Sequence, residues 1–149
     1  MIERQKVYTY ITHDSHLLLF THPNSPEAGI QVPGGTVERD EQIRDAALRE
    51  AIEETGLAGL RLSSFLGEMR RDMSDFGRDE IHHRYFFHVW CDENPPQSWR
   101  HGEFTPSGSS VQVDPIPFDF YWHNLSAGVP ALIADQDAFI PELISLLGL

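Results

Sequence analysis

One stretch of the sequence, residues 33–57, limits what this chain can fold into more than any other. It opens with a Pro-Gly-Gly turn, where missing Cβ atoms let the backbone bend sharply and approach a neighbouring group closely. A run with helical spacing follows, and it carries the three carboxylates of Glu50, Glu53 and Glu54. Offsets of three and four residues place them on one face of a helix, where like charges repel. We therefore expect an acidic helix face that another group balances.

A divalent cation is the simplest group to balance this face. No lysine or arginine lies within the stripe, and the nearest cation, Arg49, is expected to project about a quarter turn away. Carboxylate and carbonyl oxygens suit hard ions such as Mg²⁺, Mn²⁺ and Ca²⁺, and a carbonyl of the glycine turn would complete the oxygen shell. A solvated acidic helix is the commoner outcome for such a segment, so spacing alone leaves both interpretations open.

The order of residues in this stretch is more specific than its spacing. The positions that matter are Gly35, Glu41, Arg49, Glu50, Glu53, Glu54 and Gly56, followed by an apolar Leu57. Together they resemble the Nudix box, the signature of hydrolases that act on nucleoside diphosphates linked to another group. All seven fixed letters match, and Ala51 is smaller than the branched aliphatic residue usual at its position.

The resemblance implies a fold and a reaction. The fold would be an α/β/α sandwich with a mixed β-sheet, in which the box forms a loop, a helix and a second loop. The reaction would be Mg²⁺- or Mn²⁺-dependent hydrolysis of a phosphoanhydride bond in a nucleotide substrate, by attack of water at phosphorus. A Nudix-fold module that binds a nucleotide without cleaving it is the alternative, and an acidic interaction domain without metal dependence is a third interpretation.

The resemblance also assigns roles by position. The principal metal ligands would be Glu53 and Glu54, joined by the backbone carbonyl of Gly34. Glu50 would act as a further ligand or as the general base, since the family varies on this point. The supporting positions are Arg49, which would orient Glu50, Glu41 as the ion-pair partner of Arg49, and Gly35 and Gly56 at the two ends of the motif.

Outside the box the sequence offers weaker candidates. Arg70, Arg71, Arg78 and Arg84 form an arginine cluster that would suit phosphate, with Arg70 and Arg84 as the favoured candidates, although salt bridges to nearby aspartates explain it equally well. A further acidic metal ligand is predicted at Glu103, with Glu80 as the alternative. Histidines at 82, 83 and 88 do not share one face, so zinc is not expected. The sequence lacks the residues outside the box that distinguish ADP-ribose hydrolases and diadenosine tetraphosphate hydrolases. The substrate is therefore expected to be a nucleoside triphosphate or another nucleotide derivative, and the sequence does not decide between them.

The rest of the chain predicts mostly strands. Residues 7–12 and 16–21 read as a hairpin, and further strands are expected at 30–32, 60–65 (with a continuation towards 71), 80–91 and 118–122. In the 80–91 strand, the face that carries His82, Arg84 and His88 is expected to line a polar cleft. The box helix should begin between Asp40 and Ile43, with Asp40 a better N-cap than Gln42, and end at Gly56. Residues 92–117 read as a loop, and 135–147 as a helix that Pro141 starts or kinks.

Length and charge bound the remaining possibilities. The 149 residues suit one domain over 1–149, and a net charge of −12 argues against sequence-independent nucleic-acid binding. One cysteine, no apolar leader and no apolar run long enough for a membrane span indicate a cytoplasmic protein. The expected partner is a small nucleotide substrate, and the sequence leaves a homodimer open.

Overall fold

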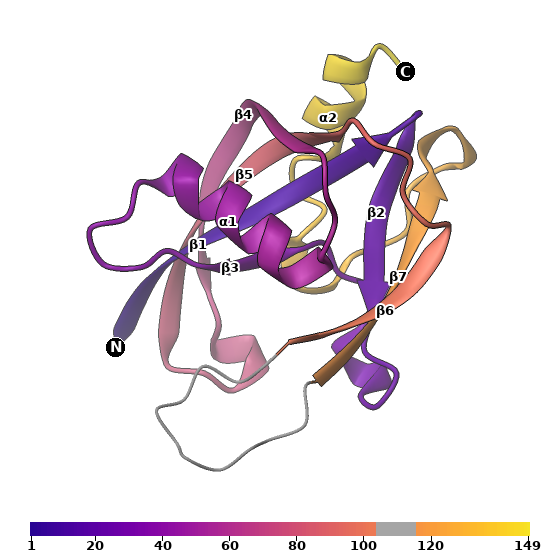
Figure 1. Ribbon diagram of the computed structural model, residues 1–149. Helices are drawn as coiled ribbons and strands as arrows, with labels where there is room; N and C mark the ends of the chain where they lie inside the picture. The colour runs from indigo at the N-terminus through magenta and orange to yellow at the C-terminus, as the bar shows by residue number, and fades with distance from the viewer. Residues whose placement is uncertain (104–115) are drawn as a thin grey trace.

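A mixed β-sheet forms the middle layer of the protein (Figure 1). The computed structural model describes residues 1–103 and 116–149, with Glu103 described by its backbone alone. The strand order is β4-β5-β1-β2-β7-β6, and β3 pairs with β1 beside this path. β1 and β5 run parallel, and the other pairs are antiparallel. The strands are β1 (Ile2–His13), β2 (His16–Thr21), β3 (Gly34–Thr36), β4 (Leu60–Asp72), β5 (Glu80–Cys91), β6 (Ser98–Glu103) and β7 (Ile116–Asn124).

The predicted hairpin of β1 and β2 is confirmed, but its strands diverge soon after the turn. Only two residue pairs join them, next to the turn at residues 14–15. The segment that leads into the box helix fills the wedge between them. Gln31 bridges to Phe20 of β2, and β3 pairs with residues 6–8 of β1. The divergence therefore leaves room at the centre of the sheet for the start of the box.

Two helices cover opposite faces of the sheet, which confirms the predicted sandwich. α1 (Ile43–Thr55) crosses in front of the sheet in Figure 1, where its small residues Ala46 and Ala47 pack on Val7 and Phe87. α2 (Ile140–Leu147) packs on the other face, in a core that includes Tyr10 and Phe86. Neither helix is long and apolar enough to span a membrane within the described residues. Short 3₁₀ turns lie at Pro26–Ala28, Ser74–Phe76, Leu125–Ala127 and Ile133–Asp135.

Several predicted boundaries shift. The N-cap of α1 is Gln42, because Asp40 adopts a left-handed φ of 63° two residues earlier. The strand predicted at 30–32 makes only the single bridge at Gln31. β6 lies within the predicted loop at 92–117, because pairing with β7 supplies order that local sequence does not encode. Pro141 stands in the first turn of α2, where its missing N–H has no helical partner to lose.

The polar face of β5 does not line a cleft, contrary to the sequence prediction. His82, Arg84 and His88 are all buried. Arg84 donates a hydrogen bond to the carbonyl of Ala134, so the chain that leads into α2 covers this part of the face. Alternation along a strand identifies which side chains share a face, but it does not say whether a later segment packs over them.

Candidate active site

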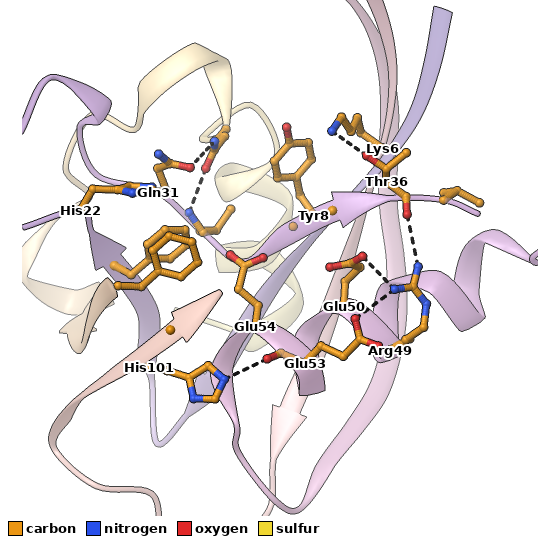
Figure 2. Close-up of a pocket in the computed structure, with 18 of the residues that line it drawn as sticks. Lys6, Tyr8, His22, Gln31, Thr36, Arg49, Glu50, Glu53, Glu54 and His101 are labelled. Atoms are coloured by element: carbon orange, nitrogen blue, oxygen red, sulfur yellow. Dashed lines mark hydrogen bonds and ion pairs between the residues drawn. The ribbon is translucent and has the colours of Figure 1, made fainter. Parts of the chain in front are cut away.

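A pocket with a volume of about 1020 Å³ opens beside α1 and β3 (Figure 2). Three kinds of side chain line it: carboxylates from α1, cations, and a group of aromatic rings with two amides. Its principal members are Lys6, Tyr8, Phe20, His22, Gln31, Gly34, Gly35, Thr36, Arg49, Glu50, Glu53, Glu54, Arg78, His101, Phe118 and Gln136. The pocket therefore brings together the box and residues far from it in the sequence.

The three carboxylates predicted from spacing do line one wall of this pocket. Glu54 is buried, with 6% of its surface exposed, whereas the Glu53 side chain is 61% exposed. Glu50 lies between these extremes, and its side chain is 15% exposed. Helical offsets thus place the three on one side, while the depth of each depends on its distance from the sheet.

Arg49 does not project away from these carboxylates, and this part of the sequence prediction was wrong. Its Nη1 lies 2.8 Å from Glu50 Oε1 and 3.2 Å from Glu53 Oε2. Nε and Nη2 bind both oxygens of Glu41, at 2.7 and 2.8 Å. Nη2 also donates to the carbonyl of Thr36 at 3.2 Å. The long side chain curls back over the helix, which a projection from Cα positions does not capture.

This arrangement shifts the titration of both partners in the Arg49–Glu41 pair. Hydrogen bonds from Arg49 lower the pKa of Glu41 to about 2. The same contacts raise the pKa of Arg49 above its usual value. Both groups remain charged at neutral pH, so the guanidinium is a fixed cation on the pocket wall.

The two glycines at the start of the box allow close contacts and do not form a turn. A Cβ on Gly35 would lie 2.1 Å from Glu50 Cδ, and one on Gly34 would lie 2.6 Å from Tyr8 Cδ1. Both residues belong to the extended strand β3, and neither has a left-handed φ. The bare backbone therefore lets Glu50 pack directly against β3, while Gly34 itself lines the pocket.

The far end of the motif closes the helix as predicted. Gly56 adopts a left-handed φ of 71°, and its N–H donates to the carbonyl of Ile52. His101 of β6 packs over Gly56, and its Nε2 lies 3.0 Å from the carbonyl oxygen of Glu53. β6 is thereby fastened to the last turn of the acidic helix, a contact that the sequence did not reveal.

Arg70, Arg84 and Glu80, three of the weaker candidates, do not line the pocket. Arg70 is exposed and lies 3.7 Å from Glu3, whereas Arg84 is buried with its guanidinium 5.0 Å from the ring centre of Tyr8. Neither lines the pocket. Glu80 pairs with Arg4 and does not line the pocket. The side chain of Glu103 lies outside the described residues.

Two cations do line the pocket, namely Arg78, which belongs to the arginine cluster noted in the sequence, and Lys6, which was not a candidate. Lys6 Nζ lies 2.7 Å from Thr36 Oγ1, and burial together with Arg4 and Arg78 lowers its pKa. Alternation along β1 puts Lys6 on the same face as Tyr8, and this is the only sequence pattern that could have grouped the two residues. No feature of the neighbouring sequence predicted that this face would lie next to the box.

Aromatic rings and amides form the wall at the other end. Phe20, Phe118 and His22 are in mutual contact, with ring centres 4.6 to 5.7 Å apart. Gln136 Oε1 accepts from the Val32 N–H at 2.9 Å, and its Nε2 donates to Gln31 Oε1 at 3.4 Å. These residues come from separate segments of the chain, so only the folded structure could reveal their proximity.

No cluster of three or more His, Cys, Asp or Glu side chains in the described parts of the chain forms a ready-made metal cage. Instead, the box presents carboxylate oxygens along a pocket wall that Gly34 also lines, and two of these oxygens are held by Arg49. Oxygen donors of this kind suit hard divalent cations and exclude soft-ligand sites.

Comparisons with known proteins agree with this architecture. A sequence model of the NUDIX domain matches residues 3–128, and a search of curated proteins finds no match. A MutT NUDIX hydrolase from Burkholderia pseudomallei is 21% identical over 96% of this chain and 99% of its own, with a TM-score of 0.61. A MutT protein from Methanosarcina mazei Go1 is 18% identical, with coverages of 97% and 96% and a TM-score of 0.64. An ADP-ribose pyrophosphatase from Streptococcus suis is 16% identical, with coverages of 97% and 91% and a TM-score of 0.59.

Proposed function

Because the chain belongs to the NUDIX family, we propose that it is a divalent-metal-dependent hydrolase of a nucleoside diphosphate-linked substrate. Water would attack phosphorus and break a phosphoanhydride bond. The observation that carries this proposal is the placement of Glu50, Glu53 and Glu54 on one wall of a pocket large enough for a nucleotide. A solvated acidic helix would not need to turn its carboxylates into such a pocket.

Four residues that line the pocket would hold Mg²⁺ or Mn²⁺: Glu50, Glu53 and Glu54 through their carboxylates, and Gly34 through its backbone carbonyl. When bound, the cation supplies charge neutralisation on the diphosphate and lowers the pKa of the attacking water. Mg²⁺ usually takes one or two carboxylates together with water and substrate phosphate, so this donor set needs no closed protein cage.

The protein's own residues position the acidic groups. Arg49 donates to one oxygen of Glu50, while the other oxygen of Glu50 faces the bare backbone of Gly35. Glu41 binds Arg49 through both oxygens and holds the guanidinium in place. Glu50 is thus fixed at the pocket wall, where it can act as a metal ligand or accept a proton from water.

The opposite walls suit a nucleotide. The rings of Phe20, Phe118 and His22 offer apolar surface for a base or sugar, and the amides of Gln31 and Gln136 offer hydrogen-bonding groups beside them. Such a wall next to the acidic helix supports a small nucleotide substrate over a protein or nucleic-acid partner.

The test is a panel of nucleotides assayed with Mg²⁺ and with Mn²⁺, comparing the wild type with Glu53→Gln. We expect metal-dependent release of phosphate or pyrophosphate that falls about 10²- to 10⁴-fold in the variant, because an ionised carboxylate is replaced by a neutral amide of the same shape. Asp45→Asn is the matched control, since Asp45 lies exposed on the same helix away from the pocket. Nucleotide binding without hydrolysis would instead indicate a binding module, and the absence of both would indicate an acidic interaction domain.

A further inference from the structure

Lys6 is the only lysine of this acidic chain, and it lies half-buried on the pocket wall. Its ammonium donates to the neutral hydroxyl of Thr36, 2.7 Å away. Within the described residues, no carboxylate comes within ion-pair distance of it. Glu80 and Glu50 attract it only from beyond that distance. A partly desolvated ammonium without a direct ion-pair partner is unfavourable, and an anion bound beside it would relieve that cost.

Arg78 provides a second cation on the same wall. It follows the turn between β4 and β5, and its side chain makes no hydrogen bond or ion pair with any described residue. Arg49, the other arginine of the pocket, is fully engaged with the glutamates and the Thr36 carbonyl. Lys6 and Arg78 are therefore the cations on this wall that an incoming anion can use.

These two cations lie at a defined end of the pocket. In Figure 2, Lys6 and Thr36 are on one side of Glu50 and Glu54, and His22 and Gln31 are on the other. The same order follows from the backbone: Gln31 pairs with β2, and Thr36 pairs with Lys6 on β1. From Gln31 to Thr36 the chain advances by five residue-to-residue steps, or roughly 16 Å at the rise of an extended strand. Such a span matches the length of an extended nucleoside triphosphate.

We propose that Lys6 and Arg78 form a subsite for an ionised terminal phosphate, which makes a nucleoside triphosphate the preferred substrate over a nucleoside diphosphate sugar. This inference rests on the proposed hydrolase function. The base would lie against the aromatic and amide wall, the diphosphate along the acidic helix, and the terminal phosphate beside Lys6. A neutral sugar in that last position would leave both cations without a partner.

The first test needs no catalysis. Reductive methylation with ¹³C-formaldehyde labels the amines of Lys6 and of the N-terminus and keeps both positively charged. Because Lys6 is the only lysine, its signal in an NMR spectrum is unambiguous, and the N-terminal amine serves as an internal control. Inorganic triphosphate, added with Mg²⁺, should shift the Lys6 signal and leave the N-terminal signal in place. Equal shifts of both signals, or none, would overturn the subsite.

The second test compares substrates. Wild type should show a higher kcat/KM for nucleoside triphosphates than for nucleoside diphosphate sugars. Lys6→Met should reduce the value for triphosphates by on the order of tenfold to a hundredfold, the worth of a charge-assisted hydrogen bond, and leave the value for the sugars unchanged. Arg78→Gln should act in the same direction but more weakly, because Arg78 is exposed.

Controls separate this inference from the proposed function. Arg44→Gln removes a cation from an exposed position of α1 outside the pocket and should leave both substrates unaffected. Thermal unfolding of Lys6→Met checks that the variant folds. An equal loss for both substrate classes, or a wild-type preference for the sugars, overturns the subsite. If no nucleotide is hydrolysed but triphosphate still shifts the Lys6 signal, the proposed hydrolase function fails while the anion subsite stands.

Discussion

Arg49 and Arg71 make nearly the same contacts in two different parts of the molecule. Arg49 on α1 binds Glu41 through two oxygens and reaches further carboxylates and a carbonyl. Arg71 on β4 binds both oxygens of Asp75, at 2.9 and 2.8 Å, and Asp135 at 3.0 Å. It also donates to the carbonyl of Asp72. In each case the hydrogen bonds raise the pKa of the arginine above its usual value.

The difference lies in what surrounds each arginine. Two carboxylates held by Arg49, Glu50 and Glu53, line the pocket beside the bare backbone of β3. The carboxylates held by Arg71 join the β4–β5 turn to the segment before α2, and none of them lines the pocket. An arginine that collects carboxylates is therefore not by itself a sign of a site. What decides is whether a carboxylate it holds also faces a cavity.

Replacing Arg49 should produce the largest effect. In Arg49→Gln, Glu50 and Glu53 lose their common donor, so we expect kcat/KM to fall about 10- to 100-fold and the apparent affinity for Mg²⁺ to weaken, as is typical when a ligand-orienting group is removed. Arg49→Lys keeps the charge but not the fork that binds Glu41 through two oxygens, so it should recover only part of the loss. Steady-state kinetics at several Mg²⁺ concentrations would measure both. Unchanged kinetics with a lower melting temperature would place Arg49 in the same structural role as Arg71.

Replacing Arg71 should affect stability and not catalysis. Arg71→Gln breaks the links from β4 to Asp75 and Asp135, so we expect the melting temperature to fall by roughly 3 to 8 °C while kcat/KM stays unchanged. Arg70→Gln is a matched control on the next residue, where the side chain is exposed and only one distant ion pair is lost. Calorimetry and the nucleotide assay would be run on both. A loss of activity in Arg71→Gln at unchanged stability would contradict the contrast drawn above.

Mild acid should leave the Arg49–Glu41 and Arg71–Asp75 pairs charged, and the smallest predicted effect arises elsewhere. The pKa of Glu41 is about 2 and that of Asp75 is also lowered by its arginine, so both carboxylates stay ionised at pH 6. Burial lowers the pKa of His88 to about 4, well below its ordinary value of 6.5. The unfolded chain therefore binds more protons between these values, and stability falls as pH drops through this window.

For His88 alone the loss between pH 7.5 and pH 6 is about 1 kcal/mol. Burial lowers the pKa of His82 as well, which adds in the same direction. Denaturant unfolding at the two pH values would measure the change, and His88→Gln should make it smaller because glutamine keeps a polar contact to Thr12 without titrating. If the variant showed the same pH dependence as the wild type, His88 would not be its source.

The box was the most predictable part of the molecule. Helical offsets among Glu50, Glu53 and Glu54 and the glycine at position 56 are local properties, so the acidic face and the helix end follow from sequence alone. For the glycines at 34 and 35 the expected close approach is confirmed, but the expected turn is not formed. The sequence favoured Asp40 over Gln42 as the N-cap without settling the choice; the cap is Gln42, and Asp40 adopts a left-handed conformation.

Outside the box, prediction failed where contacts join distant segments. Arg70 and Arg84 looked alike in sequence, yet one is solvated and the other is buried under the segment that leads into α2. Lys6 carried no motif, and β6 lay in a stretch without periodicity. Their positions depend on strand pairing and on which segment covers each face, and neither is encoded within a few residues.

By itself, the sequence determined the acidic helix, its termination, most of the strands and the chemistry of the donor groups. Tertiary structure alone decided that Arg49 also binds Glu53, that one polar face of β5 is buried, and that Lys6 and Arg78 share a pocket with the box. The physical reason is the distance along the sequence over which the interactions act. Helix and strand patterns arise from interactions between near neighbours, whereas a pocket forms where the divergence of β1 and β2 brings remote side chains together.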